Sequence, residues 1–217
     1  MNLPGSTVMP APNTSPVTIA VLAKAPIPGQ CKTRLIPAIG AHAAAALQER
    51  LTARTLATAF AADTGPVTLW CEPDYMHPTF LAFVGQRRIT LKTQPRRDLG
   101  ARMLAAIADA GGPTLVIGTD CPALTELHLR SAADALRGGS DVVLIPAEDG
   151  GYVLIGVRAP YPKIFAGIDW GKPTVLADTL ARIIDQRLVL TQRPPLWDVD
   201  TEADLARMER EIPELAL

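Results

Sequence analysis

The sequence has few cysteines, no excess of charge of either sign and no long apolar run. Three cysteines in 217 residues, without a CxxC pair, argue against a disulfide scaffold or a structural zinc site and fit a reducing cytoplasm. The 21 basic and 22 acidic side chains leave a formal net charge of -1, which argues against non-specific nucleic-acid binding. No apolar run approaches the roughly 18 residues of a membrane span, so we expect a cytoplasmic protein without a transmembrane segment.

The length and composition of the chain favour one globular domain. Hydrophobic residues make up 48% of the chain and charged residues 20%, which is enough apolar material for a sizeable core. A chain of 217 residues matches the size of one α/β domain. Residues 1–16 contain no Lys or Arg and are rich in Pro, Ser, Thr and Asn. We therefore predict a disordered N-terminal tail over residues 1–16 and a single domain over residues 17–217.

Apolar, β-branched runs alternate with helical patterns along most of the chain. The predicted strands cover residues 17–23, 67–71, 88–92, 114–118, 141–146, 152–157 and 188–191, and the predicted helices cover residues 40–62, 99–110, 125–137, 173–187 and 201–212. Continuous apolar strands between helices predict a three-layer α/β/α sandwich around a mostly parallel sheet. The two consecutive strands 141–146 and 152–157 break the alternation and predict a local antiparallel pair, so the sheet should be mixed.

The segment after the first predicted strand carries an unusual number of cations. In open α/β sheets, ligands bind beyond the carboxyl ends of the strands, so this is where site residues are sought. Lys24, Lys32 and Arg34 lie within one short segment with two prolines. Arg can hold two phosphate oxygens and Lys supplies a point charge, so the loop favours a polyphosphate site. It is not a Walker A loop, because Cys31 rather than glycine precedes Lys32. An ordinary solvated basic loop is the alternative.

Two other segments carry acidic residues that are candidates for a site. Asp120 comes after the most apolar strand and can hold a divalent cation against phosphates, although it can also cap a turn or the next helix. Thr201 and Asp204 have the spacing of a capping box, which leaves Asp198 and Asp200 unexplained. A strand-like alternation would point these two acids the same way, so one or both can complete a metal site with Asp120.

Two further segments carry candidate ligand-binding residues. Residues 98–103 open a predicted helix, where backbone amides and Arg102 can meet a nucleotide, while Asp98 as a plain N-cap is the alternative. Gly150 and Gly151 allow a ligand to approach the backbone closely, and a tight turn between strands is the alternative.

Taken in order, these segments resemble the glycosyltransferase-A-like (GT-A-like) nucleotide-diphospho-sugar transferase superfamily. Within it, they are similar to a bacterial family of uncharacterised proteins related to 2-phospho-lactate guanylyltransferase. The resemblance covers residues 17–210 and is carried by AKAPIPGQCKTRL, DLGARM, GTDCPAL, EDGGYVLIG and WDVDTEADL. It implies a Rossmann-like GT-A fold. The usual GxGTR loop is absent, and Glu202 and Ala203 replace the Pro-Glu of the late acidic signature.

The resemblance also implies roles for individual residues. The implied nucleotide-binding residues are Lys24, Gly29, Lys32, Thr33, Arg34, Asp98, Gly100 and Arg102. The implied catalytic residues are Lys32, Arg34 and Asp120, and the implied ligands of Mg²⁺ or Mn²⁺ are Asp120 and Asp200. The implied acceptor-binding residues are Glu148, Asp149, Gly150 and Gly151.

Three functions fit this pattern. A nucleotidyltransferase would move a nucleoside monophosphate from an NTP to a small phosphorylated or hydroxylated acceptor and release pyrophosphate, and the crowded basic loop favours it because a triphosphate carries more charge. A glycosyltransferase would use an NDP-sugar, but its usual DxD triplet is reduced to the single acid of Thr119-Asp120-Cys121. The third alternative is a nucleotide-binding module without catalysis. In each case the partner is a nucleotide rather than a nucleic acid.

Overall fold

The computed structural model describes residues 14–84 and 89–216, so most of the predicted tail, residues 1–13, lies outside the described residues. The strands are β1 (Thr18–Lys24), β2 (Val67–Glu72), β3 (Thr90–Thr93), β4 (Thr114–Ile117), β5 (Val142–Pro146), β6 (Tyr152–Val157) and β7 (Leu190–Gln192). The α-helices are α1 (Ile36–Ala62), α2 (Pro78–Val84), α3 (Leu99–Ala110), α4 (Glu126–Arg137), α5 (Val175–Asp185) and α6 (Glu202–Glu211). Two short 3-10 helices are η1 (Pro162–Phe165) and η2 (Pro213–Leu215).

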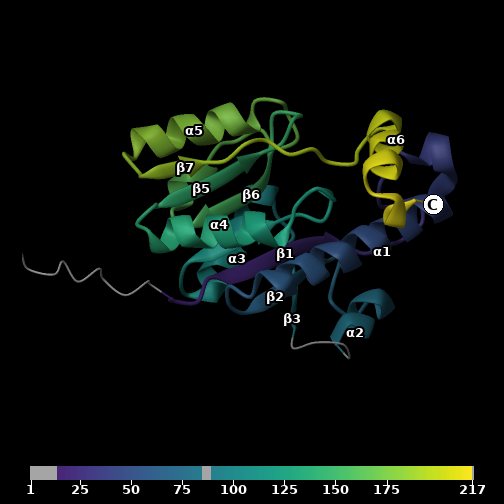
Figure 1. Ribbon diagram of the computed structural model, residues 1–217, viewed down its shortest axis with the longest axis horizontal. Coiled ribbons are helices and arrows are strands. Elements are labelled where there is room, and N and C mark those ends of the chain that lie inside the picture. Colours follow the sequence, from purple (N-terminus) through teal and green to yellow (C-terminus); the bar gives the residue numbers. More distant parts are fainter. Residues whose placement is uncertain (1–13, 85–88, 217) are drawn as a thin grey trace, which may run out of the picture.

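The strands form one seven-stranded sheet in the order β3-β2-β1-β4-β6-β5-β7 (Figure 1). Four neighbouring pairs are parallel, and the two pairs that involve β6 are antiparallel. The predicted mixed, mostly parallel sheet is confirmed, and so is the antiparallel pair formed by β5 and β6. All strands except β6 run in one direction, so their carboxyl ends share one edge. There Lys24 of β1 lies in register with Glu72 of β2.

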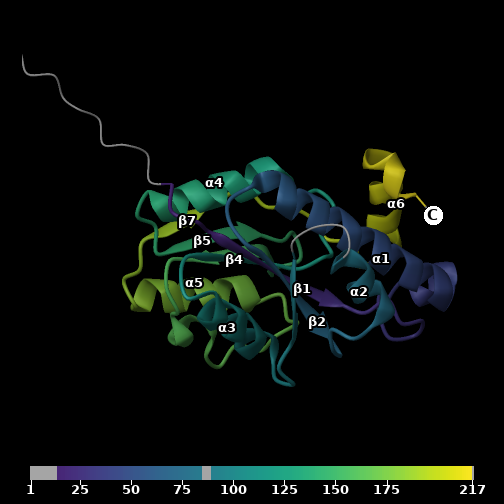
Figure 2. The same cartoon turned by 90° about the horizontal axis from the view of Figure 1, so that it is seen from below.

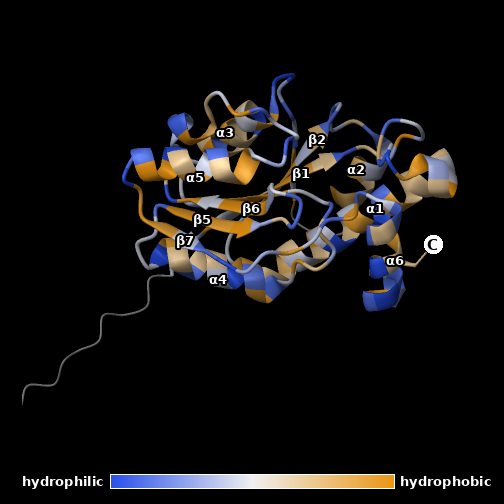
Figure 3. Cartoon of the chain, turned by 90° about the horizontal axis from the view of Figure 1, so that it is seen from above, coloured by the Kyte–Doolittle hydropathy of each residue, from blue (hydrophilic) through white to orange (hydrophobic). Residues whose placement is uncertain are grey.

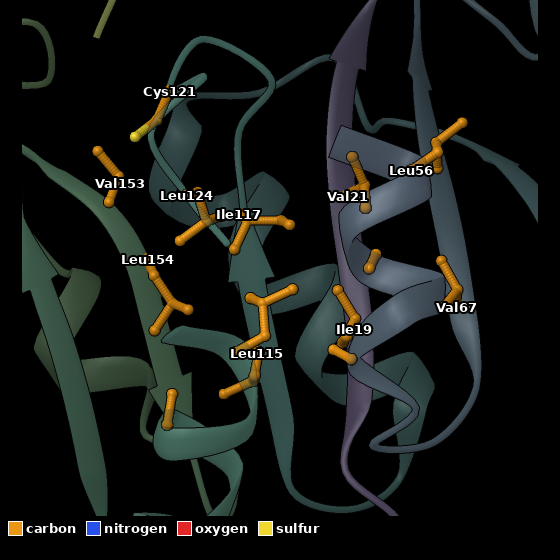
Figure 4. Close-up of a cluster of buried hydrophobic side chains, with 14 of the residues drawn as sticks. Ile19, Val21, Leu56, Val67, Leu115, Ile117, Cys121, Leu124, Val153 and Leu154 are labelled. Carbon is orange, nitrogen blue, oxygen red and sulfur yellow. The ribbon is translucent and has the colours of Figure 1, made fainter. Parts of the chain in front are cut away.

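Helices cover both faces of the sheet, which confirms the predicted three-layer sandwich. Helices α1 and α4 lie on one face, and α3 and α5 on the other (Figure 2). Leu56 of α1 and Leu129 of α4 belong to the core on the first face, part of which is drawn in Figure 4. Met103 of α3 and Ile183 of α5 belong to the core on the second face. The strands are apolar on both sides because both of their faces are covered by helices.

Two helices differ from the sequence prediction. Helix α1 begins at Ile36 rather than at residue 40: Pro37 suits a first turn, and the helix bends at Gly40, whose φ of 79° and ψ of 160° are not helical. Helix α2 was not predicted, because seven residues are too few to display a helical period. Within residues 14–84 and 89–216, no helix is both long and apolar enough to cross a membrane.

Helix α6 and the segment before it pack beside the beginning of α1 (Figure 1). The buried residues of this cluster are Leu35, Leu47, Leu51, Trp197, Val199, Leu205, Met208, Ile212 and Leu215. The outer side of α6 is hydrophilic (Figure 3). The predicted capping box is confirmed: the Thr201 Oγ1 accepts from the Asp204 amide at 3.3 Å, and the Asp204 carboxylate accepts from the Thr201 amide at 2.8 Å. This packing holds residues 197–200 at the carboxyl edge of the sheet.

The carboxylate of Asp141 links the start of β5 to the segment before β7 by a hydrogen bond. Asp141 is 9% exposed; it accepts hydrogen bonds from the Val189 amide and the Tyr161 hydroxyl, each at 2.9 Å, and pairs with Arg158. The Val189 amide first, and then Tyr161 and Arg158, hold the pKa of Asp141 below its usual range. A lowered folded-state pKa means that the carboxylate stabilises the fold above its unfolded pKa of about 3.9 and stops doing so as the pH falls through the folded value.

We expect Asp141→Asn to lower the free energy of unfolding by about 2 to 3 kcal/mol at pH 7, because an amide replaces a charged acceptor and leaves its partly buried donors poorly paired. The difference from the parent should shrink as the pH falls below about 4, because Asp141 is then protonated in the unfolded chain before it is protonated in the folded parent. Urea unfolding at pH 7 and pH 3 measures both values. An equal difference at the two pH values would contradict this assignment.

Candidate functional site

A cleft of about 410 Å³ opens at the carboxyl edge of the sheet. Its lining residues are Leu22, Ala23, Lys24, Lys32, Thr33, Arg34, Gln48, Glu72, Gln94, Leu99, Arg102, Met103, Val116, Ile117, Gly118, Thr119, Asp120, Cys121, Tyr152, Val153, Asp198 and Asp200. The cleft thus gathers most of the cations and acids that the sequence singled out. Its position agrees with the rule that open α/β sheets bind ligands beyond the carboxyl ends of their strands.

The Lys32 ammonium lies between two aspartates. Its Nζ is 2.6 Å from a carboxylate oxygen of Asp120 and 3.7 Å from one of Asp200, and it donates to the Val199 carbonyl at 2.7 Å. The Lys32 side chain is only 4% exposed, and its φ of 46° is in the left-handed region. The turn therefore directs Lys32 inward to the acids instead of outward to solvent, which argues against an ordinary solvated basic loop.

Three carboxylates, those of Asp120, Asp198 and Asp200, line the cleft. The Val199 amide donates to the Asp120 carbonyl at 2.9 Å, which ties the segment before α6 to the loop after β4. Asp198 lies in the same cleft, and burial, with Asp120 and Asp149 adding repulsion, raises its pKa to about 7. The alternative that Asp120 caps the next helix is wrong, because Thr125 is the N-cap of α4.

Other residues of the basic loop lie at the open side of the cleft. The Arg34 side chain is 70% exposed and its Nη1 contacts the Asp200 carboxylate at 3.2 Å. Lys24 and Thr33 also line the cleft. Gly29 is not among the lining residues; its φ of 82° serves the turn.

Arg102 reaches the cleft from α3 and is held by two residues that the sequence analysis did not select. Its Nη1 lies 2.9 Å from the Glu72 carboxylate and 3.2 Å from Gln94 Oε1. The Gln94 amide nitrogen donates to the carbonyls of Ala23 and Trp70, which fixes its oxygen toward Arg102. Glu72 ends β2 and Gln94 follows β3, so the strand-end rule that selected Lys24 could have found both.

Asp98 and Gly100 are not among the residues that line the cleft. Asp98 is the N-cap of α3, and its carboxylate accepts from the Ala101 amide at 2.8 Å, which is the alternative that the sequence left open. Gly100 is buried, and a Cβ added there would lie 2.5 Å from Trp170 Cζ2. The nucleotide-binding roles of Asp98 and Gly100 stay predictions.

Two of the four predicted acceptor-binding residues line a second cavity, and the other two do not. A cavity of about 350 Å³ is lined by Asp149 and Gly151, together with Arg34, Asp198 and Asp200 of the first cleft.

Glu148 and Gly150 are not among its lining residues. The Glu148 carboxylate is 2.9 Å from Nη1 of Arg207, whose guanidinium stacks 4.5 Å from the centre of the Trp197 ring. Gly150 packs against Pro173. The acceptor-binding roles of these residues also stay predictions.

The carboxylate oxygens of the site suit a hard divalent cation whose coordination shell is completed by substrate phosphates. Mg²⁺ usually takes one or two protein carboxylates plus phosphate oxygens, and Asp120 and Asp200 supply two. Among the described residues, no group of three or more His, Cys, Asp or Glu side chains is placed to hold a metal on its own. Lys32 supplies positive charge between the two acids. The predicted pair of ligands is thus brought together, but only with substrate oxygens would it form a complete coordination shell.

The solved structures of similar fold include one that is a transferase by its title. A candidate nucleotide-diphospho-sugar transferase from Desulfovibrio desulfuricans G20 is 29% identical, with a TM-score of 0.81 over 90% of this chain and 88% of the other. The 4-diphosphocytidyl-2C-methyl-D-erythritol synthase of Anaerococcus prevotii DSM 20548 is 11% identical, with a TM-score of 0.60 over 91% and 96% of the two chains. Rv0371c of Mycobacterium tuberculosis H37Rv, in a complex with manganese, is 13% identical, with a TM-score of 0.53 over 90% and 100%.

The last two likenesses show the fold alone, and all three agree with the Rossmann-like fold of the nucleotide-sugar transferases that the sequence motifs implied. The first likeness, at 29% identity, supports the prediction of a nucleotide-using transferase. No protein of curated function matches the chain. Residues 55–172, just over half of the chain, match a family model, and the chain therefore belongs to the family described as "uncharacterized protein conserved in bacteria (DUF2064)".

Proposed function

We propose that this protein is a metal-dependent nucleotidyltransferase, which joins a nucleoside monophosphate from an NTP to a small acceptor and releases pyrophosphate. The observation that carries the proposal is the charge pattern of the cleft. Lys24 at the end of β1 and Lys32 and Arg34 of the following loop line the cleft, and Lys32 and Arg34 pair with the carboxylates of Asp120 and Asp200. A triphosphate with a divalent cation matches this pairing of cations with acids better than a neutral ligand does.

In the proposed reaction, Asp120 and Asp200 would hold Mg²⁺ or Mn²⁺ against the phosphates. The bound cation would supply Lewis-acid stabilisation of the phosphate oxygens. Lys32 and Arg34 would stabilise the negative charge that develops on the α-phosphate and on the leaving pyrophosphate. An oxygen of the acceptor attacks the α-phosphorus, and the bond from that phosphorus to the pyrophosphate oxygen breaks. The protein's contribution is positioning and charge stabilisation, without a covalent intermediate.

Glycosyl transfer from an NDP-sugar is the second candidate function. The 29% identical neighbour is a candidate nucleotide-diphospho-sugar transferase by its title, and the second cavity beside the acids offers room for a sugar. Against it, the loop after β4 carries one acid where a DxD triplet has two. The products separate the two reactions: nucleotidyl transfer releases pyrophosphate, and glycosyl transfer leaves a nucleoside diphosphate.

The test is a thermal-shift panel with NTPs, NDPs and NDP-sugars, each with Mg²⁺, Mn²⁺ or EDTA. A ligand at 100 times its dissociation constant adds about 2.7 kcal/mol, which raises the melting temperature of a chain of this size by roughly 5 to 10 °C. We expect a metal-dependent shift with at least one NTP, and pyrophosphate release when an acceptor is supplied. A larger shift with an NDP-sugar than with its NDP would favour glycosyl transfer, and no shift with any nucleotide would overturn both functions.

A further inference from the structure

The second cavity has a wall that the sequence motifs did not include. It shares Arg34, Asp198 and Asp200 with the first cleft, and it is also lined by the segment Trp170-Gly171-Lys172-Pro173 between η1 and α5. A molecule in this cavity would therefore lie next to the acids and beside the nucleotide cleft. That is the position of the second substrate in the proposed reaction.

Two glycines allow this segment to pack closely against the rest of the protein. A Cβ at Gly100 would lie 2.5 Å from Trp170 Cζ2, and a Cβ at Gly150 would lie 2.2 Å from the Pro173 carbonyl oxygen. Gly150 also has a φ of 93°, which disfavours any other residue. The Leu176 amide donates to the Gly150 carbonyl at 2.9 Å, which holds the beginning of α5 at the same place. The glycines of DLGARM and EDGGYVLIG thus allow Trp170 and Pro173 to pack closely against the rest of the protein.

The side chains of the wall suit an anion with an apolar or cyclic part. Trp170 is half-buried, so one part of its indole is fixed while another part lines the cavity. Lys172 is exposed, and within residues 14–84 and 89–216 it takes part in none of the ion pairs that the structure records. The cavity is lined by the acids Asp149, Asp198 and Asp200 and by the bases Arg34 and Lys172. A divalent cation on the acids would turn this excess of negative charge into an excess of positive charge.

We propose that Trp170 and Lys172 select the acceptor: Lys172 binds an anionic group of the acceptor, a phosphate or a carboxylate, and Trp170 packs against its apolar or ring portion. The proposal rests on the proposed function, because it assigns the cavity to the second substrate of that reaction. It concerns binding alone and involves no covalent change. An ammonium on a flexible stem serves as a point charge for either anion.

The test compares Lys172→Met with the matched control Lys163→Met, which removes an exposed lysine of η1 outside the cavity lining. Inorganic phosphate and acetate are titrated calorimetrically into each protein, first alone and then with Mg²⁺ and a non-reacting NTP analogue filling the nucleotide cleft. We expect Lys172→Met to weaken binding of the preferred anion at least fivefold in the filled protein, and Lys163→Met to leave it unchanged. The anion that binds more tightly to the parent tells a phosphate-bearing acceptor from a carboxylate-bearing one.

Gly150→Ala provides a second variant that keeps Lys172. The added methyl group must displace Pro173, so anion binding should weaken while the NTP analogue still binds as in the parent. Anion binding that is absent from the parent, or equal in the parent and Lys172→Met, would overturn the acceptor assignment. A nucleotide response without Lys172-dependent anion binding contradicts this inference alone, and Lys172-dependent anion binding without any nucleotide response contradicts the proposed function alone.

Discussion

Asp120→Asn is expected to lower turnover by at least about 100-fold while the protein keeps its fold. Asparagine has nearly the shape of aspartate but no charge, so it binds a divalent cation weakly and no longer neutralises Lys32 at 2.6 Å. A loss of one preorganised charge of this kind corresponds to roughly 3 to 4 kcal/mol in the activation barrier. Pyrophosphate release with the NTP chosen by the thermal-shift panel measures the change in turnover.

A control variant and the melting temperature of Asp120→Asn separate a loss of folding from a loss of catalysis. The backbone bond from the Val199 amide to the Asp120 carbonyl does not depend on the carboxylate, so the loop after β4 should keep its position. Asp109→Asn removes a partly exposed acid that pairs with Lys92 and is not among the residues lining the two cavities. It should leave turnover unchanged. Turnover of Asp120→Asn within a few-fold of the parent would refute the assigned role of Asp120.

The layer architecture could be predicted because both faces of the sheet are covered. Continuous apolar strands between helical patterns have few other arrangements, and each of the seven predicted strands is found at nearly the predicted position. The place of α6 could not be predicted in the same way. It is set by contacts between residues distant in sequence, such as Leu47 of α1 and Met208 of α6, and hydropathy periods carry no information about such partners.

The candidate site was predictable where it follows strand ends and unpredictable where it depends on packing. Lys24, Asp120 and their neighbours were found because strand ends mark the ligand-binding edge. That Lys32 turns inward to Asp120 follows from a left-handed backbone conformation, which its sequence does not reveal. Trp170 and Lys172 were missed because their segment precedes a helix rather than follows a strand, and only the folded chain brings it beside the acids.

Lys32→Met is expected to reduce turnover by about 100- to 1000-fold and, in the protein without nucleotide, to tighten Mn²⁺ binding by about tenfold. The loss of turnover follows from removing a cation that stabilises phosphate charge. The gain in metal affinity has a different cause. The ammonium lies 2.6 Å from Asp120 and 3.7 Å from Asp200, so it competes with a divalent cation for the same two carboxylates. Methionine keeps the apolar stem of this nearly buried side chain but not its charge.

Electron paramagnetic resonance of free Mn²⁺ measures the affinity without requiring turnover, and Arg34→Met is the comparison. Arg34 is 70% exposed and contacts Asp200 but not Asp120, so its removal should change Mn²⁺ affinity less than removal of Lys32. Weaker or unchanged Mn²⁺ binding by Lys32→Met would contradict the competition. The expected tighter binding of Mn²⁺ by Lys32→Met has a consequence for the parent. There Lys32 occupies Asp120 and Asp200 until the phosphates of a nucleotide draw it away. Nucleotide and metal would therefore bind together.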